Sequence, residues 1–185
     1  MIKVLFFGNH DVGVSSLNTL LKVASVIGVV AHPEDPEDGV RYKSLYEFSL
    51  NKGLRVIRGK AQDKSVIDFC SEVKPQLIWV TDYRYLLPNS LINIPSLGAV
   101  NIHPSLLPKY RGRASLNWAL INGEKEIGLT GHFIDQGTDT GDIIFQQILK
   151  VNEDDDIGDI LDRLIPEYEF ITRKIINLFE ENAIN

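Results

Sequence analysis

Apolar runs alternate with helix-like stretches through the first half of the chain. Short β-rich runs predict buried strands at residues 2–7, 26–31, 54–57 and 76–81. Apolar positions spaced three and four residues apart predict helices between these strands, at residues 15–22, 42–51 and 65–73. No hairpin signal joins neighbouring strands, so the pattern predicts right-handed βαβ crossovers and a parallel sheet with helices on both faces.

The second half of the chain changes this alternation. A strand is expected to end at residue 103, a helix at 114–122 follows, and two further strands are expected at 127–134 and 143–151. These last two strands lack an intervening helix, so we expect them to form an antiparallel pair at one edge of the sheet. A terminal helix is expected at 157–178, which Pro166 would kink or split.

The predicted fold class is therefore α/β, a Rossmann-like open, mostly parallel twisted sheet with helices on both faces and an antiparallel edge. At 185 residues we expect a single domain spanning 1–185. A net charge of −6 disfavours a nucleic-acid partner. Cys70, the one cysteine, is expected to pack as an apolar side chain in a helix. No membrane-length apolar stretch or signal peptide is recognised, so a cytoplasmic location is expected.

The most informative stretch is the strand that ends at His103. Side chains alternate along a strand, so Asn101 and His103 share one face while Ile102 points into the opposite layer. Pro104 cannot donate to a sheet and ends the strand. In open α/β sheets, ligands bind at the carboxyl ends of strands. Taken singly, either residue more often serves a turn or a satisfied hydrogen bond; the pair points to function.

A second polar segment, residues 135–142, follows another apolar strand and is rich in carboxylates and glycine. It could supply an acid that partners His103. The remaining histidines favour structural interpretations. His10, in a turn expected at 8–13, is expected to be solvated, and His132 is expected to pack or bond beside the sheet more readily than to act as a second active-site imidazole. The four histidines show no ligand spacing, so no metal is expected. The acidic segment 32–39 is expected to be a solvated loop rather than a lid.

The string NIHPSLLP (residues 101–108), followed by Arg111-Gly112 and by DTGD (139–142), resembles the folate-dependent formyltransferases. The resemblance extends from the first strand to about residue 150. It implies that Asn101, His103 and Asp139 are catalytic and that 10-formyltetrahydrofolate is the co-substrate. It also implies folate contacts in the segments after two strands, with Tyr83, Arg84, Tyr85, Leu86, Asp135 and Gly137 as candidates. For the side chains of Tyr85 and Leu86, simple packing is an equal alternative.

Candidate acceptor contacts are Gly8 and Asn9 in the first turn and the cations Lys109, Arg111 and Arg113. The three cations follow the catalytic strand in an acidic chain, which favours an anionic acceptor or the folate tail over a merely solvated loop.

Formyl transfer requires an amine to attack the formyl carbon, and the formyl oxygen then gains negative charge. Asn101 and His103 would donate hydrogen bonds to that oxygen. Asp139, acting through a water or through His103, would relay the proton from the attacking amine to the leaving folate nitrogen. We expect the Asp139 carboxylate to favour the charged form of His103.

Three branches of the resembled family compete for the acceptor. The first turn departs from the phosphate loop of the glycinamide ribonucleotide enzymes. For methionyl-tRNA enzymes, 185 residues leave no room for a tRNA-contacting domain and the charge is unfavourable, although tRNA is not excluded. An amino-sugar nucleotide is therefore the narrowly favoured acceptor. A formyltetrahydrofolate hydrolase and a non-catalytic folate-binding protein are the alternatives, and a homodimer stays open.

Overall fold

The structure is a computed structural model that describes residues 1–34 and 43–184. Residues 35–39, most of the acidic loop expected at 32–39, lie outside the described residues, as does residue 42, the expected start of the second helix. The chain divides into two compact units, Met1–Val100 and Asn101–Asn185. A single domain spanning 1–185 stays a prediction.

The first unit is built on parallel strands in the order β3-β2-β1-β4. They are β1 (Lys3–Gly8), β2 (Ser25–Ala31), β3 (Val56–Arg58) and β4 (Leu77–Thr81). β1 pairs in parallel with both β2 and β4, and β2 pairs in parallel with β3. All five residues of β4 are buried, as expected for a strand covered on both faces. The predicted parallel βαβ arrangement is confirmed.

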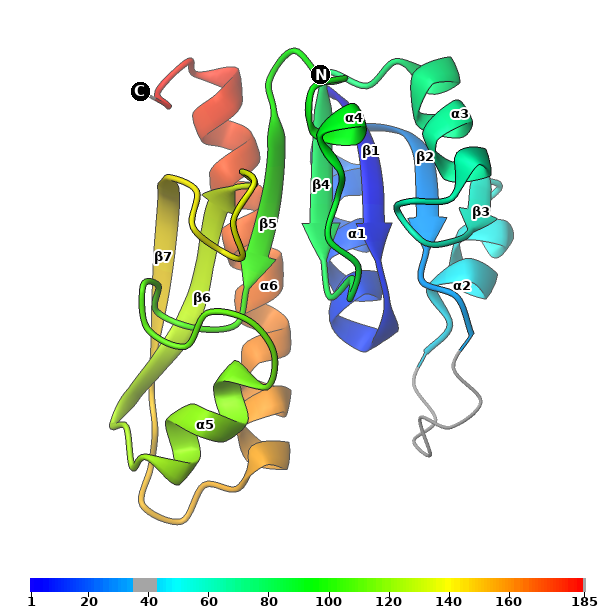
Figure 1. The fold of residues 1–185 in the computed structure, drawn as a ribbon. Helices are drawn as coiled ribbons and strands as arrows, with labels where there is room; N and C mark the ends of the chain where they lie inside the picture. The colour runs from blue at the N-terminus through cyan, green and yellow to red at the C-terminus, as the bar shows by residue number, and fades with distance from the viewer. Residues whose placement is uncertain (35–42, 185) are drawn as a thin grey trace. The chain divides into compact units, whose positions relative to one another are not determined.

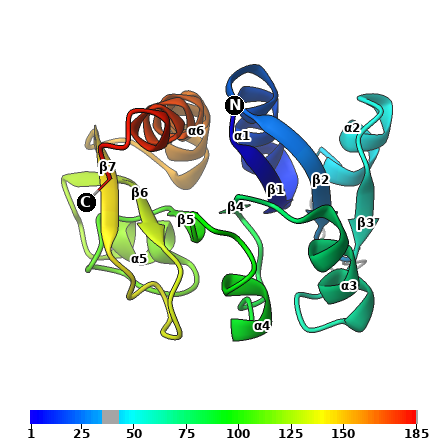
Figure 2. The ribbon, with the colours of Figure 1, turned by 90° about the horizontal axis from the view of Figure 1, so that it is seen from above.

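Helices cover both faces of this sheet. They are α1 (His10–Val23), α2 (Leu45–Asn51), α3 (Lys64–Val73) and the short α4 (Asn89–Ile92). α1 and α2 pack on one face, whereas α3 and α4 lie on the other (Figure 2). Cys70 is buried in α3, as predicted, and burial raises the pKa of its thiol to about 12. The sequence pattern did not predict α4, which is a single turn and too short to show periodicity.

The turn expected at residues 8–13 is wrong. β1 ends at Gly8 and α1 begins at His10, so only Asn9 separates them. The buried face of α1 starts with Gly13 and Val14, just before the helix expected at 15–22, and Gly13 carries no apolar side chain that could extend the pattern. Asp11 in the first turn favours this early start, because a carboxylate is stabilised at a helix N-terminus.

The second unit contains the antiparallel part of the fold. Its strands follow the order β5-β6-β7. They are β5 (Ala99–His103), which enters this unit at Asn101, β6 (Glu126–Phe133) and β7 (Ile143–Lys150). β6 and β7 form an antiparallel pair from Glu126↔Lys150 to His132↔Ile143. The helices are α5 (Ser115–Ile121) and α6 (Ile157–Glu180), and α6 packs on β6 and β7 (Figure 1). The expected antiparallel edge is confirmed.

Pro166 lies inside α6 without splitting it, so that part of the prediction is wrong. A proline inside a helix costs about 3 kcal/mol. The buried face of α6 continues on both sides of Pro166, and its packing outweighs this cost: Ile160, Leu164, Tyr168, Ile171 and Ile175 are buried. At the N-terminus of α6, Asp156 and Asp159 form a capping box that satisfies the first backbone N–H groups of the helix.

No helix within residues 1–34 and 43–184 is long and apolar enough to cross a membrane.

Candidate active site

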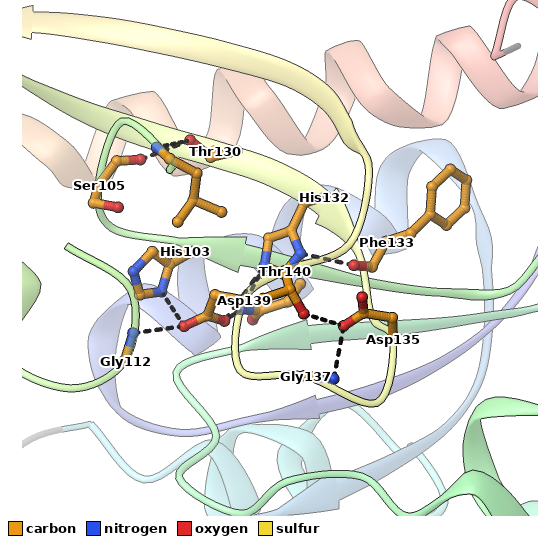
Figure 3. A network of polar contacts seen from close by, with 12 residues as sticks. His103, Ser105, Gly112, Thr130, His132, Phe133, Asp135, Gly137, Asp139 and Thr140 are labelled. Atoms are coloured by element: carbon orange, nitrogen blue, oxygen red, sulfur yellow. Dashed lines mark hydrogen bonds and ion pairs between the residues drawn. The ribbon is translucent and has the colours of Figure 1, made fainter. Parts of the chain in front are cut away.

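Asp139 contacts both polar side chains of β5, and Figure 3 shows its carboxylate beside His103. Its Oδ1 accepts a hydrogen bond from Nδ2 of Asn101 at 3.3 Å, and its Oδ2 lies 3.4 Å from Nδ1 of His103. Asn101 and His103 reach the same carboxylate because they are two residues apart on one strand. The structure therefore brings together the three residues expected to be catalytic.

Backbone geometry fixes the position of this carboxylate. Asp139 has a φ of +52°, a conformation uncommon for residues other than glycine, in the loop between β6 and β7. Gly112 donates its N–H to Oδ2 of Asp139 at 2.9 Å, so the loop that follows β5 also holds the carboxylate (Figure 3). The site is thus formed where two loops of the second unit meet.

His132 lies beside these three residues, and it is buried and hydrogen-bonded beside the sheet, as expected. Its Nε2 lies 3.3 Å from Nδ2 of Asn101 and 3.5 Å from Oδ1 of Asp139, and only 2% of its side chain is exposed. The sequence held a signal: His132 and Thr130 alternate with apolar residues on β6, which marks a polar face. Thr130 on that face donates to the carbonyl of Ser105 at 2.7 Å (Figure 3).

The hydrogen bonds determine which nitrogen of each imidazole carries the proton. Nε2 of His103 lies 2.8 Å from the main-chain oxygen of Tyr110, which can only accept, so Nε2 is protonated. In the neutral ring, Nδ1 facing Asp139 is therefore an unprotonated base. His132 has the opposite arrangement, because its Nδ1 donates to the oxygen of Phe133 at 2.7 Å.

The Asp139 carboxylate favours the charged form of His103, as expected from the sequence, but burial has the larger effect. Burial lowers the pKa of His103, and this effect outweighs the raising effects of the Asp139 carboxylate and of the Tyr110 carbonyl. Burial also opposes ionisation of Asp139. However, His132, His103 and the Gly112 N–H together hold the pKa of this carboxyl below its usual value. At neutral pH these shifts favour a neutral His103 imidazole beside an ionised Asp139 carboxylate.

Asn101 directs its amide nitrogen toward His132 and Asp139. The opposite amide orientation would place its carbonyl oxygen against the Asp139 carboxylate and would be repulsive. Donation from Asn101 to a formyl oxygen, as expected from the sequence, therefore requires it to exchange one of these two hydrogen bonds for one to the substrate.

The predicted cations do not behave alike. All three side chains are exposed, but Lys109 forms an ion pair with Glu124 at 3.0 Å. In the loop between β6 and β7, Asp135 accepts hydrogen bonds from the N–H of Gly137 at 3.0 Å and from Thr140 at 2.6 Å. These contacts shape the loop, and both predicted folate residues in it are exposed.

Four predicted folate residues follow β4 in the first unit. The Tyr83 hydroxyl donates to the oxygen of Gly59 at 2.6 Å, and Tyr85 stacks on His32 with ring centroids 4.9 Å apart. Both tyrosine rings are thus held within their own unit. Arg84 is exposed, and Leu86 is 64% exposed, so the packing alternative does not apply to its side chain.

Gly8 ends β1, and Asn9 joins it to His10 at the start of α1. Nδ1 of His10 lies 2.8 Å from Oδ2 of Asp82, and Nδ2 of Asn9 lies 3.0 Å from Nε2 of His10. Only 17% of the His10 side chain is exposed, so the expected solvated turn histidine is wrong. Across the described residues of both units, no group of three or more His, Cys, Asp or Glu side chains is arranged to hold a metal ion.

These residues lie in a segment with a recognised family pattern. Residues 2–175 match the family model described as Formyl transferase. The chain belongs to the formyl transferase family. The family resemblance stated from residues 101–108 and 139–142 is therefore confirmed.

Individual relatives extend this finding. The chain is 37% identical over 171 residues to methionyl-tRNA formyltransferase of Caldanaerobacter subterraneus subsp. tengcongensis, covering 88% of this chain and 55% of the relative. The phosphoribosylglycinamide formyltransferase structure from Anaplasma phagocytophilum superimposes with a TM-score of 0.84 at 21% identity, covering 100% of this chain and 89% of that one. This second likeness supports the predicted Rossmann-like fold.

A third relative is the N-formyltransferase of Helicobacter canadensis, solved in complex with folinic acid and dTDP-3-aminofucose. It superimposes with a TM-score of 0.76 at 26% identity, covering 100% of this chain and 66% of that one. The chain spans 55% to 61% of the length of several methionyl-tRNA formyltransferases that it matches.

Proposed function

We propose that this protein transfers a formyl group from 10-formyltetrahydrofolate to a primary amine, with Asn101, His103 and Asp139 at the reaction centre. The observation that carries the proposal is the arrangement in the second unit, where Asp139 lies 3.3 Å from Asn101 and 3.4 Å from His103. Membership of the formyl transferase family supports the same chemistry.

The arrangement suits a base-assisted acyl transfer. The acceptor amine attacks the formyl carbon, a C–N bond forms, and the formyl oxygen becomes an oxyanion. Neutral His103 accepts the amine proton on Nδ1, and the imidazolium that forms lies beside ionised Asp139. The bond between the formyl carbon and the folate nitrogen then breaks, and that nitrogen takes the proton from His103. A donor aimed at the oxyanion typically contributes about 10²–10³ in rate, and Asn101 is the candidate donor.

The acceptor that the relatives favour is methionyl-tRNA. Several methionyl-tRNA formyltransferases are 32–37% identical to this chain, a higher identity than the 25–26% of the two sugar formyltransferase structures. This order reverses the expectation from the sequence, which placed an amino-sugar nucleotide first. The exposed guanidinium groups of Arg111 and Arg113 are available to phosphates of either acceptor.

An amino-sugar nucleotide is the second candidate. The specific support is the Helicobacter canadensis N-formyltransferase, whose structure holds folinic acid and dTDP-3-aminofucose and whose fold covers all of this chain. The net charge of this chain, −6, also makes it a poor match for a polyanion such as tRNA.

A mass-spectrometric acceptor screen tests both proposals. The protein is mixed with 10-formyltetrahydrofolate and, in separate reactions, with methionyl-tRNA, with amino-sugar nucleotides and with glycinamide ribonucleotide. A gain of one formyl group on methionyl-tRNA supports the first candidate, and a gain on a sugar nucleotide supports the second. Release of formate without any modified acceptor would indicate a hydrolase, and no consumption of folate would refute formyl transfer. Loss of activity in His103→Gln would tie the reaction to the site.

A further inference from the structure

Tyr110 adopts an unusual backbone conformation at the point where its carbonyl meets His103. Its φ is +54°, in the left-handed region, which costs free energy for a residue other than glycine. This conformation directs the main-chain oxygen of Tyr110 to Nε2 of His103 at 2.8 Å. Something in the structure must therefore hold Tyr110 in place.

The side chain of Tyr110 is fixed by the turn that follows α5. Its hydroxyl donates to Oε1 of Glu124 at 2.9 Å and accepts from Nδ2 of Asn122 at 3.1 Å. Lys109, the preceding residue, places its ammonium 3.0 Å from the same Glu124 oxygen. Glu124 thus binds two consecutive residues of the loop that carries the Tyr110 carbonyl.

Packing alone leaves this ring room to move. A pocket of about 260 Å³, partly open to solvent, is lined by Tyr110, Glu124, Leu116 and Ile127. On the side of this pocket Tyr110 has fewer packing contacts, so its polar contacts contribute more to its fixed position. The hydrogen bonds of the hydroxyl therefore hold the ring.

We propose that Tyr110 and Glu124 are positioning residues that fix the tautomer and orientation of His103. Glu124 holds the Tyr110 side chain, and the Tyr110 carbonyl accepts the proton of Nε2. Nδ1 is thereby left unprotonated and turned toward Asp139 and the acceptor. The inference deepens the proposed function, because Nδ1 is the atom assigned to take the amine proton.

The rest of the loop is anchored independently of Glu124. Ser105 donates its hydroxyl to the oxygen of Lys109 at 2.8 Å, and the Gly112 N–H donates to Asp139 at 2.9 Å. These bonds flank Tyr110 on both sides. Loss of the Glu124 contact is therefore expected to release the carbonyl of Tyr110 without unfolding the loop.

The tautomer of His103 can be read directly by NMR. In the unliganded protein with ¹⁵N-labelled histidine, long-range ¹H–¹⁵N correlations distinguish a protonated Nε2 from a protonated Nδ1. His103→Gln identifies the signal, since the chain has four histidines. We expect a single Nε2–H form in the natural protein and a mixture in Tyr110→Phe and Glu124→Ala. A single unchanged Nε2–H form in both variants, or an Nδ1–H form in the natural protein, would overturn the proposal.

Kinetics with the acceptor found in the screen supply the second readout. We expect Tyr110→Phe and Glu124→Ala to lower kcat about tenfold, with KM for 10-formyltetrahydrofolate changed less than about twofold, because the ground-state contacts stay intact. Glu124→Gln keeps an oxygen that can accept from Tyr110 and is expected to recover most of the loss. Glu126→Ala, an exposed carboxylate two residues away, is the matched control. Variants that all equal this control would refute the positioning role.

The two readouts separate this inference from the proposed function. If no acceptor is formylated, the proposed function fails, but the NMR experiment still decides whether Tyr110 and Glu124 set the tautomer. If formyl transfer is found and the tautomer is insensitive to both substitutions, only the positioning role fails.

Discussion

Replacing Asp139 by asparagine tests the electrostatic role that the structure gives this carboxylate. Asparagine has nearly the same shape and keeps an oxygen that can accept from Gly112, but it carries no charge. The imidazolium that forms on His103 during proton transfer then has no partner. The resting state is affected much less, because His103 is neutral there. We therefore expect kcat to fall while KM changes little.

The size of the effect follows from the distance between the charges. Two unit charges 3.4 Å apart, the distance between Nδ1 of His103 and Oδ2 of Asp139, attract by about 5 kcal/mol at an effective dielectric constant of 20. The amide dipole of asparagine and some added solvent recover part of this energy. A net loss of about 2–4 kcal/mol corresponds to a fall in kcat of roughly 30- to 1,000-fold.

The assay is steady-state formyl transfer measured by mass spectrometry, with unfolding followed by circular dichroism to confirm that Asp139→Asn folds. Asp142→Asn, an exposed carboxylate of the same loop, is the control and should keep its activity. A value of kcat within threefold of the natural protein in folded Asp139→Asn would refute the charge-pairing argument.

Three further predictions concern stability. Thr130→Val leaves the buried Ser105 carbonyl and Leu107 N–H without a partner and should destabilise the protein by about 2–4 kcal/mol in urea unfolding. Burial lowers the pKa of His32, so the folded protein binds fewer protons than the unfolded chain below pH 6.5 and loses stability as the pH falls. The fall in Tm between pH 7.5 and pH 5.5 should therefore be smaller in His32→Phe. Asp156→Ala removes the N-cap of α6 and should cost about 1 kcal/mol.

Two of the three stability predictions, those for Thr130 and Asp156, have a matched control variant. Thr138→Val and Asp154→Ala alter exposed residues and should change the free energy of unfolding by less than about 0.5 kcal/mol. A similar loss in Thr138→Val would contradict the hydrogen-bond argument for Thr130. For His32, equal pH slopes in the natural protein and the phenylalanine variant would show that another group titrates. A fully stable Asp156→Ala would mean that the capping box contributes nothing to α6.

Hydrophobic patterning predicted most elements of the fold because burial acts on each strand and helix separately. The strand expected to end at His103 is β5, and the pair without an intervening helix is the antiparallel β6 and β7. The pattern failed where another part of the chain decides local structure. Pro166 stays within a continuous α6 because packing on β6 and β7 supplies energy that a local propensity does not contain.

The sequence by itself determined the fold class, the family and the three residues expected to be catalytic, because strand alternation and a long specific motif are local properties of the chain. Tertiary structure decided the environment of those residues. Burial lowers the pKa of His103, the carbonyl of Tyr110 lies against its Nε2, and His132 on β6 contacts Asn101. Desolvation and hydrogen bonding depend on groups that are distant in the sequence, so no local pattern could have shown them.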